Sequence, residues 1–281
     1  MTPTPPTPAP LPESAATTQA DVLRYSGGTP KRHSDILARE EPLEIRVRGR
    51  SIAVTMRTPG HDRELAAGFL FTEGLIHNPH EIVEMGPCLQ GDAPENTLNV
   101  FISPAVEVDF ERLTRHVFAT SSCGLCGKAS IEAVHQHFPP VDSNMTVPLP
   151  VLAGLPERMR AAQQTFAETG GLHAAAIFDV AGSLIVLRED VGRHNAVDKV
   201  LGFGLLSNRL PFDAGVLLVS GRASFEIVQK ALAARIPIVC AISAPSSLAV
   251  DFARESGQTL VGFLRGETMN IYSRPERVMG Q

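Results

Sequence analysis

Several residue types and signals are scarce or missing in this 281-residue sequence. Tryptophan is absent and tyrosine occurs only twice. Four cysteines in a chain of this length do not make a disulfide framework, so we expect a reducing, cytoplasmic environment. The N-terminus has no basic region followed by an apolar core, which predicts no signal peptide. No apolar run is long enough to span a bilayer, so we expect a soluble protein without a membrane partner.

Positive charge is also in short supply. The formal net charge is −5, and the sequence shows no basic helix face and no basic arm. A duplex nucleic-acid partner is therefore not expected. With 43% hydrophobic and 20% charged residues, the chain has enough apolar side chains for one large domain or two smaller domains with real cores.

Three common signatures of nucleotide and hydrolase sites are missing. Gly127-Lys128 is followed by alanine and lacks the upstream glycine of a Walker A motif. Gly202-x-Gly204 lacks the third glycine of a dinucleotide fingerprint and falls late in a predicted helix. The sequence contains no Gly-x-Ser-x-Gly elbow, so an α/β-hydrolase site is not expected.

The most informative stretch is 121–128, where Cys123 and Cys126 lie three positions apart among small residues. The alanine-rich segment 129–137 that follows is compatible with a helix. Unpaired N–H groups at a helix N-terminus and the nearby cation of Lys128 both favour thiolate over thiol. Because the thiolate is the reactive form, the pattern predicts a reactive cysteine pair.

Two other readings of this pair stay open from the residues alone. A structural zinc site needs four ligands, but Cys88 and Cys240 are isolated, and His135 and His137 would point to different helix faces. A thioredoxin-like redox pair normally follows a βαβ start, which is missing here. Zinc deamination is not expected, because no proline precedes Cys123 and His173-Ala174-Ala175 has no glutamate.

The N-terminal half predicts a tail followed by a small α+β domain. Residues 1–20 are rich in Pro, Thr and Ala and are expected to be disordered, with order beginning near Leu43. The domain, placed at residues 40–115, has alternating strand patterns and one amphipathic helix, at 43–47, 52–56, 62–72 (the helix), 82–85 and 98–102. His61 and Asp62 lie at the start of this helix and are interpreted as a surface histidine and a cap.

The C-terminal half, 116–275, alternates strands and helices. Residues 139–156 are expected to be a connector, followed by a helix from Pro156 to Thr169 that ends at Gly170-Gly171. The strands and helices after it are predicted at 174–180, 183–187, 190–206 (helix, capped by Asp190), 215–219, 223–234 (helix), 238–242, 246–255 (helix), 260–264 and 269–272. The alternation from Gly215 onward predicts parallel strand pairing.

Three loops in this half favour a phosphate-bearing ligand: 188–195, 220–224 and 263–268. The first two combine glycine, hydroxyl and arginine groups with a helix N-terminus, where anions bind well. Ligands of open α/β sheets gather at the carboxyl ends of strands. Taken singly, each loop is also explained by caps, turns and surface charges. The spacing of His194 with Asp190 and Asp198 suits a metal ligand, an oriented base or a plain ion pair.

The chain resembles the formate dehydrogenase accessory sulfurtransferase family, known as FdhD, from about Pro42 to Tyr272. The motifs that carry the resemblance are Ser122-Cys123-Gly124-Leu125-Cys126-Gly127, Gly170-Gly171-Leu172-His173, Glu189-Asp190-Val191-Gly192-Arg193-His194-Asn195-Ala196-Val197-Asp198-Lys199 and Ser220-Gly221-Arg222-Ala223-Ser224. Each is weak alone, but in this order they indicate one family.

The resemblance implies an α/β fold: a cytidine deaminase-like α/β/α sandwich with a smaller N-terminal α+β domain, in a homodimer. It also implies a sulfur carrier that takes sulfur from a cysteine desulfurase as a persulfide on Cys123, with Cys126 as partner. The acceptor would be the molybdenum of bis(molybdopterin guanine dinucleotide), bis-MGD, before this cofactor enters formate dehydrogenase. No permanent metal is expected.

For the bound bis-MGD, the expected contacts combine arginines for phosphates, hydroxyl and amide groups, and the family's cofactor-binding stretch. They are Arg193, His194, Asn195, Ser220, Arg222 and Ser224, together with Phe263, Leu264, Arg265, Gly266, Glu267 and Thr268. Two other functions remain open: a non-catalytic chaperone for the molybdenum cofactor and a thiol–disulfide oxidoreductase.

Overall fold

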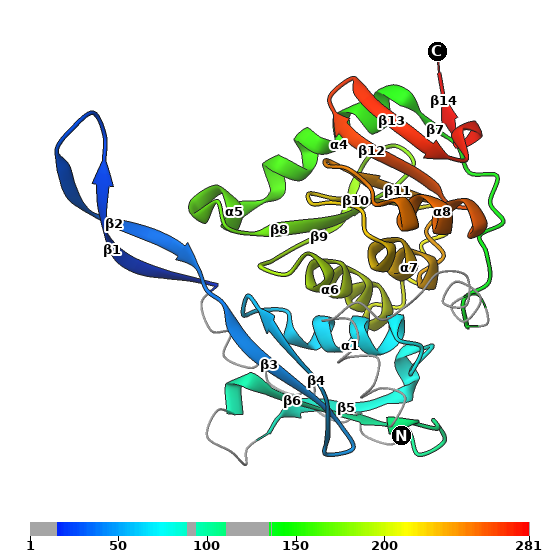
Figure 1. Cartoon of the computed structure of the whole chain (residues 1–281). Helices are drawn as coiled ribbons and strands as arrows, with labels where there is room; N and C mark the ends of the chain where they lie inside the picture. The colour runs from blue at the N-terminus through cyan, green and yellow to red at the C-terminus, as the bar shows by residue number, and fades with distance from the viewer. Residues whose placement is uncertain (1–15, 89–93, 111–134, 136, 281) are drawn as a thin grey trace, which may run out of the picture.

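The computed structural model describes residues 16–88, 94–110, 135 and 137–280. Two sheets lie at opposite ends of the main body, with helices packed between them (Figure 1). A four-stranded sheet belongs to the N-terminal half and a six-stranded sheet to the C-terminal half. No helix within the described ranges is both long and apolar enough to cross a membrane.

The N-terminal unit follows the predicted strand and helix pattern closely. Its sheet has the order β4-β3-β6-β5, made of β3 (Glu41–Val47), β4 (Arg50–Arg57), β5 (Ile82–Pro87) and β6 (Thr97–Ile102). The helix α1 (Asp62–Thr72) covers the inner face, where Leu65 and Leu70 are fully buried. The short 3-10 helices η1 (Pro79–Glu81) and η2 (Pro94–Asn96) connect its later strands.

The prediction that order begins near Leu43 is wrong. Strands β1 (Thr17–Tyr25) and β2 (Pro30–Ala38) form an antiparallel hairpin that projects from the body (Figure 1). Most of its side chains are exposed, so it lacks the alternation of buried apolar residues that signals a half-buried strand. Of the predicted disordered tail, residues 16–20 therefore belong to ordered structure, and residues 1–15 lie outside the described residues.

The larger sheet has the order β13-β12-β11-β10-β8-β9. The parallel pairing predicted from Gly215 onward is confirmed for the three central strands, β10 (Val216–Val219), β11 (Ile238–Ala241) and β12 (Thr259–Arg265). The hairpin of β8 (His173–Phe178) and β9 (Leu184–Asp190) pairs antiparallel with β10 through β8, and β13 (Thr268–Ser273) closes the other edge. Two short strands, β7 (Val147–Pro148) and β14 (Val278–Met279), pair separately, and the 3-10 helix η3 (Pro275–Arg277) precedes β14.

Helices cover both faces of this sheet. On one face lie α6 (Arg193–Leu206), α7 (Phe225–Ala233) and α8 (Ser247–Glu255), packed on sheet residues such as Ile177 and Leu217. On the other face lies α4 (Leu149–Ala162), packed on neighbours such as Ala176 and Leu218, followed by α5 (Gln164–Thr169). The alternation along each strand supplies both cores.

Two predicted boundaries in this half need correction. A helix begins at Leu149 rather than at Pro156, because Leu152, Leu155 and Met159 recur at helical spacing and are buried. Pro156 lies inside α4. Asp190 does not serve as the N-cap of the next helix: Gly192 occupies the cap position, and Asp190 accepts a hydrogen bond from its N–H.

The two halves share one core. Helix α1 packs directly on α6, and a cluster of buried apolar residues runs from Leu43 in β3 through Val197 in α6 to Leu260 in β12. At the crossing, a Cβ on Gly68 would lie 1.8 Å from the carbonyl oxygen of Asp198. A Cβ on Gly202 would lie equally close to the carbonyl oxygen of Glu64, so the backbones of the two helices are in contact.

Candidate functional site

The predicted ligand loops meet at one edge of the six-stranded sheet. Because β8 runs antiparallel to both β9 and β10, strand β9 points the same way as β10, β11 and β12. The carboxyl ends of these four strands therefore share an edge, which we call the carboxyl edge, and the segments 188–195, 220–224 and 263–268 follow three of them. The amino end of β8, at His173, lies on the same edge.

The first loop leads into an open helix N-terminus. Helix α6 starts at Arg193 and has no side-chain N-cap, so its first N–H groups have no partner among the described residues. The Nε atom of Arg193 is buried and likewise has no hydrogen-bond partner in the described part of the chain. A guanidinium beside unpaired N–H groups at a helix N-terminus is a favourable arrangement for an anion.

His194, next along the helix, contacts the second loop. Its Nε2 lies 3.1 Å from Oγ of Ser224 and 3.8 Å from a carboxylate oxygen of Glu226. Burial, together with the cations of Lys230 and Arg193, lowers the pKa of His194 to about 4, while Glu226 opposes the shift. The imidazole is therefore neutral near pH 7 and donates or accepts a hydrogen bond as a neutral group.

His173 packs against the glycine of the second loop. A Cβ on Gly221 would lie 3.3 Å from Nδ1 of His173 and 3.8 Å from Cδ of Arg193, so glycine allows both side chains to approach the loop backbone. Burial and the charge of Arg193 lower the pKa of His173, and the carboxylate of Asp190 acts in the opposite direction. The site thus presents neutral imidazoles beside the partly buried guanidinium of Arg193.

Two predicted ligand residues are engaged within the protein. The Oγ of Ser220 accepts a hydrogen bond from the N–H of Ala174 at 2.9 Å. The Nδ2 of Asn195 donates to the carbonyl of Met56 and to Asp190, and its Oδ1 accepts from the hydroxyl of Thr55 at 3.2 Å. The amide of Asn195 therefore links α6 to β4, although it remains a predicted cofactor contact by motif.

The third loop is the turn between β12 and β13. Phe263 has a left-handed backbone (φ 53°), is exposed, and donates its N–H to the carbonyl of Ser243. The Nε of Arg265 donates to the carbonyl of Ile242 at 3.3 Å, and its guanidinium lies 6.0 Å from the ring centroid of Phe263. Leu264 is buried, whereas Gly266, Glu267 and Thr268 are exposed.

The loops form a continuous row along the edge. Ala223 forms a bridge with Pro245, and a Cβ on Gly262 would lie 2.8 Å from Cδ of Pro245, which connects the second loop to the third through the end of β11. Arg222 is exposed and makes no hydrogen bond or ion pair to a described residue. Strands β8 and β12 are three strand spacings apart, or about 14 Å, so the row suits an extended ligand.

The cysteine pair lies outside the described residues, which leave out 111–134. Predictions about Cys123, Cys126 and the helix after them are therefore not tested by the geometry. The two other cysteines, Cys88 and Cys240, are both buried. Burial raises the pKa of Cys240 to about 12, so this thiol is not a nucleophile at neutral pH.

Some residues at the edge were not predicted as ligand contacts. His173 belongs to a family motif but is not a predicted ligand contact, and Glu226 lies in none of the motifs. The sequence could have indicated Glu226, because this residue follows the N-cap Ser224 by two positions and so lies in the first turn of α7, beside the second loop. No group of three or more His, Cys, Asp or Glu side chains in the described ranges is arranged to hold a metal ion.

The two carboxylates spaced four residues from His194, Asp190 and Asp198, pair with lysines instead. Asp198 forms a buried ion pair with Lys230 at 2.8 Å and accepts from the hydroxyl of Thr72. Asp190 forms a buried ion pair with Lys199 at 2.7 Å. Of the interpretations left open for this spacing, the geometry shows ion pairs, but neither pair includes His194.

Comparison with known proteins covers almost the whole chain. The family model described as the FdhD/NarQ family matches residues 38–279. A protein from Mycobacterium tuberculosis named sulfur carrier protein FdhD is 49% identical over 272 residues, covering 94% of this chain and 99% of its own. Proteins of the same name are 51% identical over 269 residues in Streptomyces avermitilis (93% of this chain, 95% of theirs) and 43% identical over 257 residues in Sulfolobus acidocaldarius (92% and 96%).

A solved structure agrees with these relatives. The crystal structure of a formate dehydrogenase accessory protein from Desulfotalea psychrophila superposes with a TM-score of 0.74 at 28% identity. The match covers 94% of this chain and all of that one. The resemblance stated from the motifs is therefore confirmed, and this chain belongs to the FdhD/NarQ family.

Proposed function

We propose that this protein is a sulfur carrier that takes sulfur from a cysteine desulfurase as a persulfide on Cys123 and transfers it to bis-MGD for formate dehydrogenase. The names of its relatives and of the similar structure support the sulfur-carrier and accessory roles. The observation that carries the proposed binding of bis-MGD lies at the carboxyl edge. There the buried Nε of Arg193 has no partner among the described residues and lies beside the open N-terminus of α6.

In this proposal the sulfur chemistry uses both motif cysteines. The thiolate of Cys123 attacks the terminal sulfur of the donor's persulfide, a new S–S bond forms on Cys123, and the donor leaves as a thiolate. The thiolate of Cys126 then attacks the inner sulfur of this persulfide. That step forms a Cys123–Cys126 disulfide, supplies the two electrons, and releases the terminal sulfur as hydrosulfide for the molybdenum.

The carboxyl edge fits bis-MGD as a bound substrate because that molecule is long and carries pyrophosphates. In this proposal Arg193, Arg222 and Arg265 contact phosphates, and the neutral His194 and the hydroxyl of Ser224 supply hydrogen bonds. The exposed ring of Phe263 offers a face for a guanine base.

Three further features are part of the proposal. The protein acts in the cytoplasm, as a homodimer, and it delivers the sulfurated cofactor to the formate dehydrogenase polypeptide. The C-terminal half is proposed to be a cytidine deaminase-like sandwich, supported by the antiparallel β8–β9 hairpin next to three parallel strands with helices on both faces.

Guanine-nucleotide binding tests the cofactor part. GDP titrated calorimetrically into the full chain is expected to bind, and the double variant Arg222→Ala/Arg265→Ala is expected to bind on the order of tenfold more weakly or worse, because charge-assisted hydrogen bonds are lost. The matched control is Arg24→Ala/Arg32→Ala, which removes two exposed arginines of the projecting hairpin. Equal affinity of the two double variants would overturn the assignment.

A further inference from the structure

We propose that Asp190, Lys199 and Thr58 are positioning residues that hold the N-terminal turn of α6 in its anion-binding orientation. The connection from β4 to α1 in the N-terminal unit is thus part of the support of the ligand site, although no residue of it belongs to the carboxyl edge. The identity of the ligand rests on the proposed function, but the positioning itself does not.

Asp190 uses both carboxylate oxygens to fix the loop. Its Oδ1 accepts from the N–H of Gly192 at 2.8 Å and from Nδ2 of Asn195 at 3.0 Å. Its Oδ2 accepts from Lys199 at 2.7 Å and from the N–H of Thr58 at 3.2 Å. The side chain is fully buried, so one carboxylate orients both the cap residue Gly192 and Asn195 in the first turn of α6.

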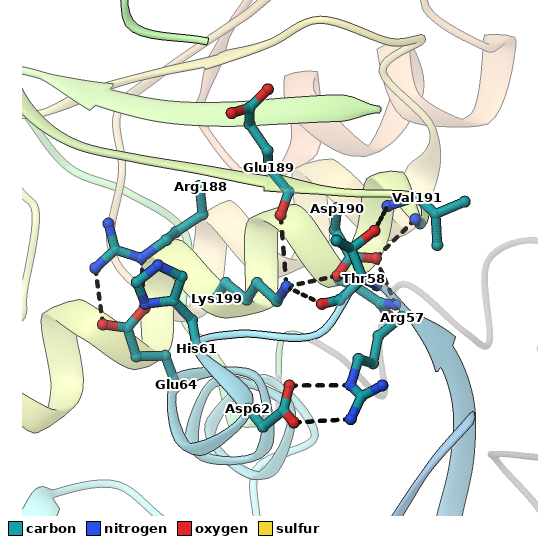
Figure 2. Close-up of polar contacts among 12 residues, drawn as sticks. Arg57, Thr58, His61, Asp62, Glu64, Arg188, Glu189, Asp190, Val191 and Lys199 are labelled. Atoms are coloured by element: carbon teal, nitrogen blue, oxygen red, sulfur yellow. Dashed lines mark hydrogen bonds and ion pairs between the residues drawn. The ribbon is translucent and has the colours of Figure 1, made fainter. Parts of the chain in front are cut away.

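Lys199 neutralises this carboxylate and ties it to the N-terminal unit. Its ammonium, also buried, donates to the carbonyl of Thr58 at 2.8 Å and to the carbonyl of Glu189 at 3.4 Å (Figure 2). Because a buried charge without partners is costly, these contacts restrict where the lysine and the carboxylate can lie. The position of Thr58 is therefore coupled to that of the loop.

Thr58, in the N-terminal unit, forms hydrogen bonds with both Val191 and Asp190. Its hydroxyl oxygen accepts from the N–H of Val191 at 3.2 Å, and its own N–H donates to Asp190 (Figure 2). Thus the backbone of Val191 and Gly192, immediately before Arg193, is held by hydrogen bonds to Thr58 and Asp190. These are the residues that set where the guanidinium and the free N–H groups of α6 point.

A second polar contact between the same units does not involve the N-terminal turn of α6. Arg188 at the end of β9 pairs bidentately with Glu64 of α1, at 2.5 and 2.8 Å, whereas the pair of Arg57 with Asp62 lies within the N-terminal unit (Figure 2). Neither pair contacts Val191, Gly192 or Arg193 among the described residues. The Arg188–Glu64 pair therefore provides a control in which contact between the units is weakened while the loop keeps its hydrogen bonds.

The test compares Thr58→Val, Lys199→Met and the control Arg188→Met in the full chain. Valine keeps the shape of threonine and removes only the hydroxyl acceptor. Residue-resolved amide exchange is measured at Gly192 and Ala196, whose N–H groups keep their own partners in Thr58→Val, and GDP affinity is measured in parallel. Thr58→Val is expected to raise exchange at both amides about tenfold and to weaken GDP binding several-fold.

The Arg188→Met control shows what a general weakening of the contact between the two units does. Arg188→Met is expected to lower the melting temperature while leaving exchange at Gly192 and Ala196 and GDP affinity close to wild type. Lys199→Met, if it folds, should exceed Thr58→Val in both readouts. Unchanged exchange at both amides in Thr58→Val, or an equal increase in Arg188→Met, overturns the positioning role. Absence of GDP binding by the wild type would instead refute the cofactor proposal, and the exchange rates would still decide this one.

Discussion

At the scale of single residues, the site is defined by what burial does to ionisable groups. His194 is held neutral by burial and by nearby cations, so its imidazole does not compete with arginines for an anion. The same shift affects folding stability. The unfolded histidine, with a pKa near 6.5, binds a proton between about pH 6.5 and pH 4, whereas the folded one does not.

His194→Gln is therefore expected to change the pH profile of stability. In the wild type, the free energy of unfolding decreases as pH falls from about 6.5 to about 4, because the unfolded state takes up the proton. The variant loses this contribution, so its profile is flatter across that window. Chemical denaturation at pH 7 and pH 5 measures the difference, and parallel profiles of the two proteins would contradict the assignment.

Cys240 provides a second residue-scale prediction. Because its thiol is fully buried with a pKa of about 12, it is expected to resist alkylation in the native protein at pH 8. The cysteines of the 121–128 motif, if reactive as proposed, are modified under the same conditions. Peptide mass spectrometry after iodoacetamide gives the modification of each cysteine, with a denatured sample as the control. Native modification of Cys240 at the denatured rate would be inconsistent with this burial.

At the scale of elements, the α1–α6 crossing depends on glycine. Gly68→Ala or Gly202→Ala would place a Cβ 1.8 Å from a carbonyl oxygen of the opposite helix, so the helices must separate. Overpacking of this kind costs about 1–3 kcal/mol or more. Either variant should lower the melting temperature by several degrees in a thermal scan.

Gly154→Ala is the matched control for this prediction. Gly154 also lies in a helix, α4, but the nearest atom to an added Cβ is 3.9 Å away. Alanine there is expected to stabilise the chain by about 0.5–1 kcal/mol, because glycine is a poor helix former. If the crossing variants behaved like Gly154→Ala, the close contact of the two helices would be refuted.

Elements with a regular apolar period could be predicted from sequence, and contacts between distant segments could not. The helices 62–72 and 246–255 and the parallel strands from Gly215 were predicted nearly to their observed bounds. The hairpin 17–38 was missed because its exposed strands carry no buried apolar face.

For the candidate site, the positions of the loops could be predicted from the sequence, but the side-chain contacts could not. Three loops at the carboxyl ends of strands are found on one edge, as expected for an α/β sheet. The partners of individual side chains were not predictable: Asn195, expected at the ligand, also bonds Met56 and Thr55, more than 130 residues away in the chain. Such pairings depend on the packing of α1 against α6, which no local pattern encodes.

At the scale of the whole molecule, one continuous core joins the two halves. Buried residues of β3, α1, α6, α7 and β12 belong to a single cluster, and hydrogen bonds from the buried lysines cross the same boundary, from Lys199 to Thr58 and from Lys230 to Thr72. We therefore expect one cooperative thermal transition rather than two. Calorimetry with equal calorimetric and van't Hoff enthalpies would agree, whereas two resolved transitions would show that the halves fold independently.

The proposed function of the whole molecule is to carry sulfur on Cys123. The most direct measurement is intact-protein mass spectrometry after incubation with a cysteine desulfurase and cysteine. We predict a gain of one sulfur that is lost on reduction and is absent in Cys123→Ala. No gain in the wild type, with loading of the desulfurase confirmed, would contradict it and would favour a cofactor-binding chaperone or a redox pair.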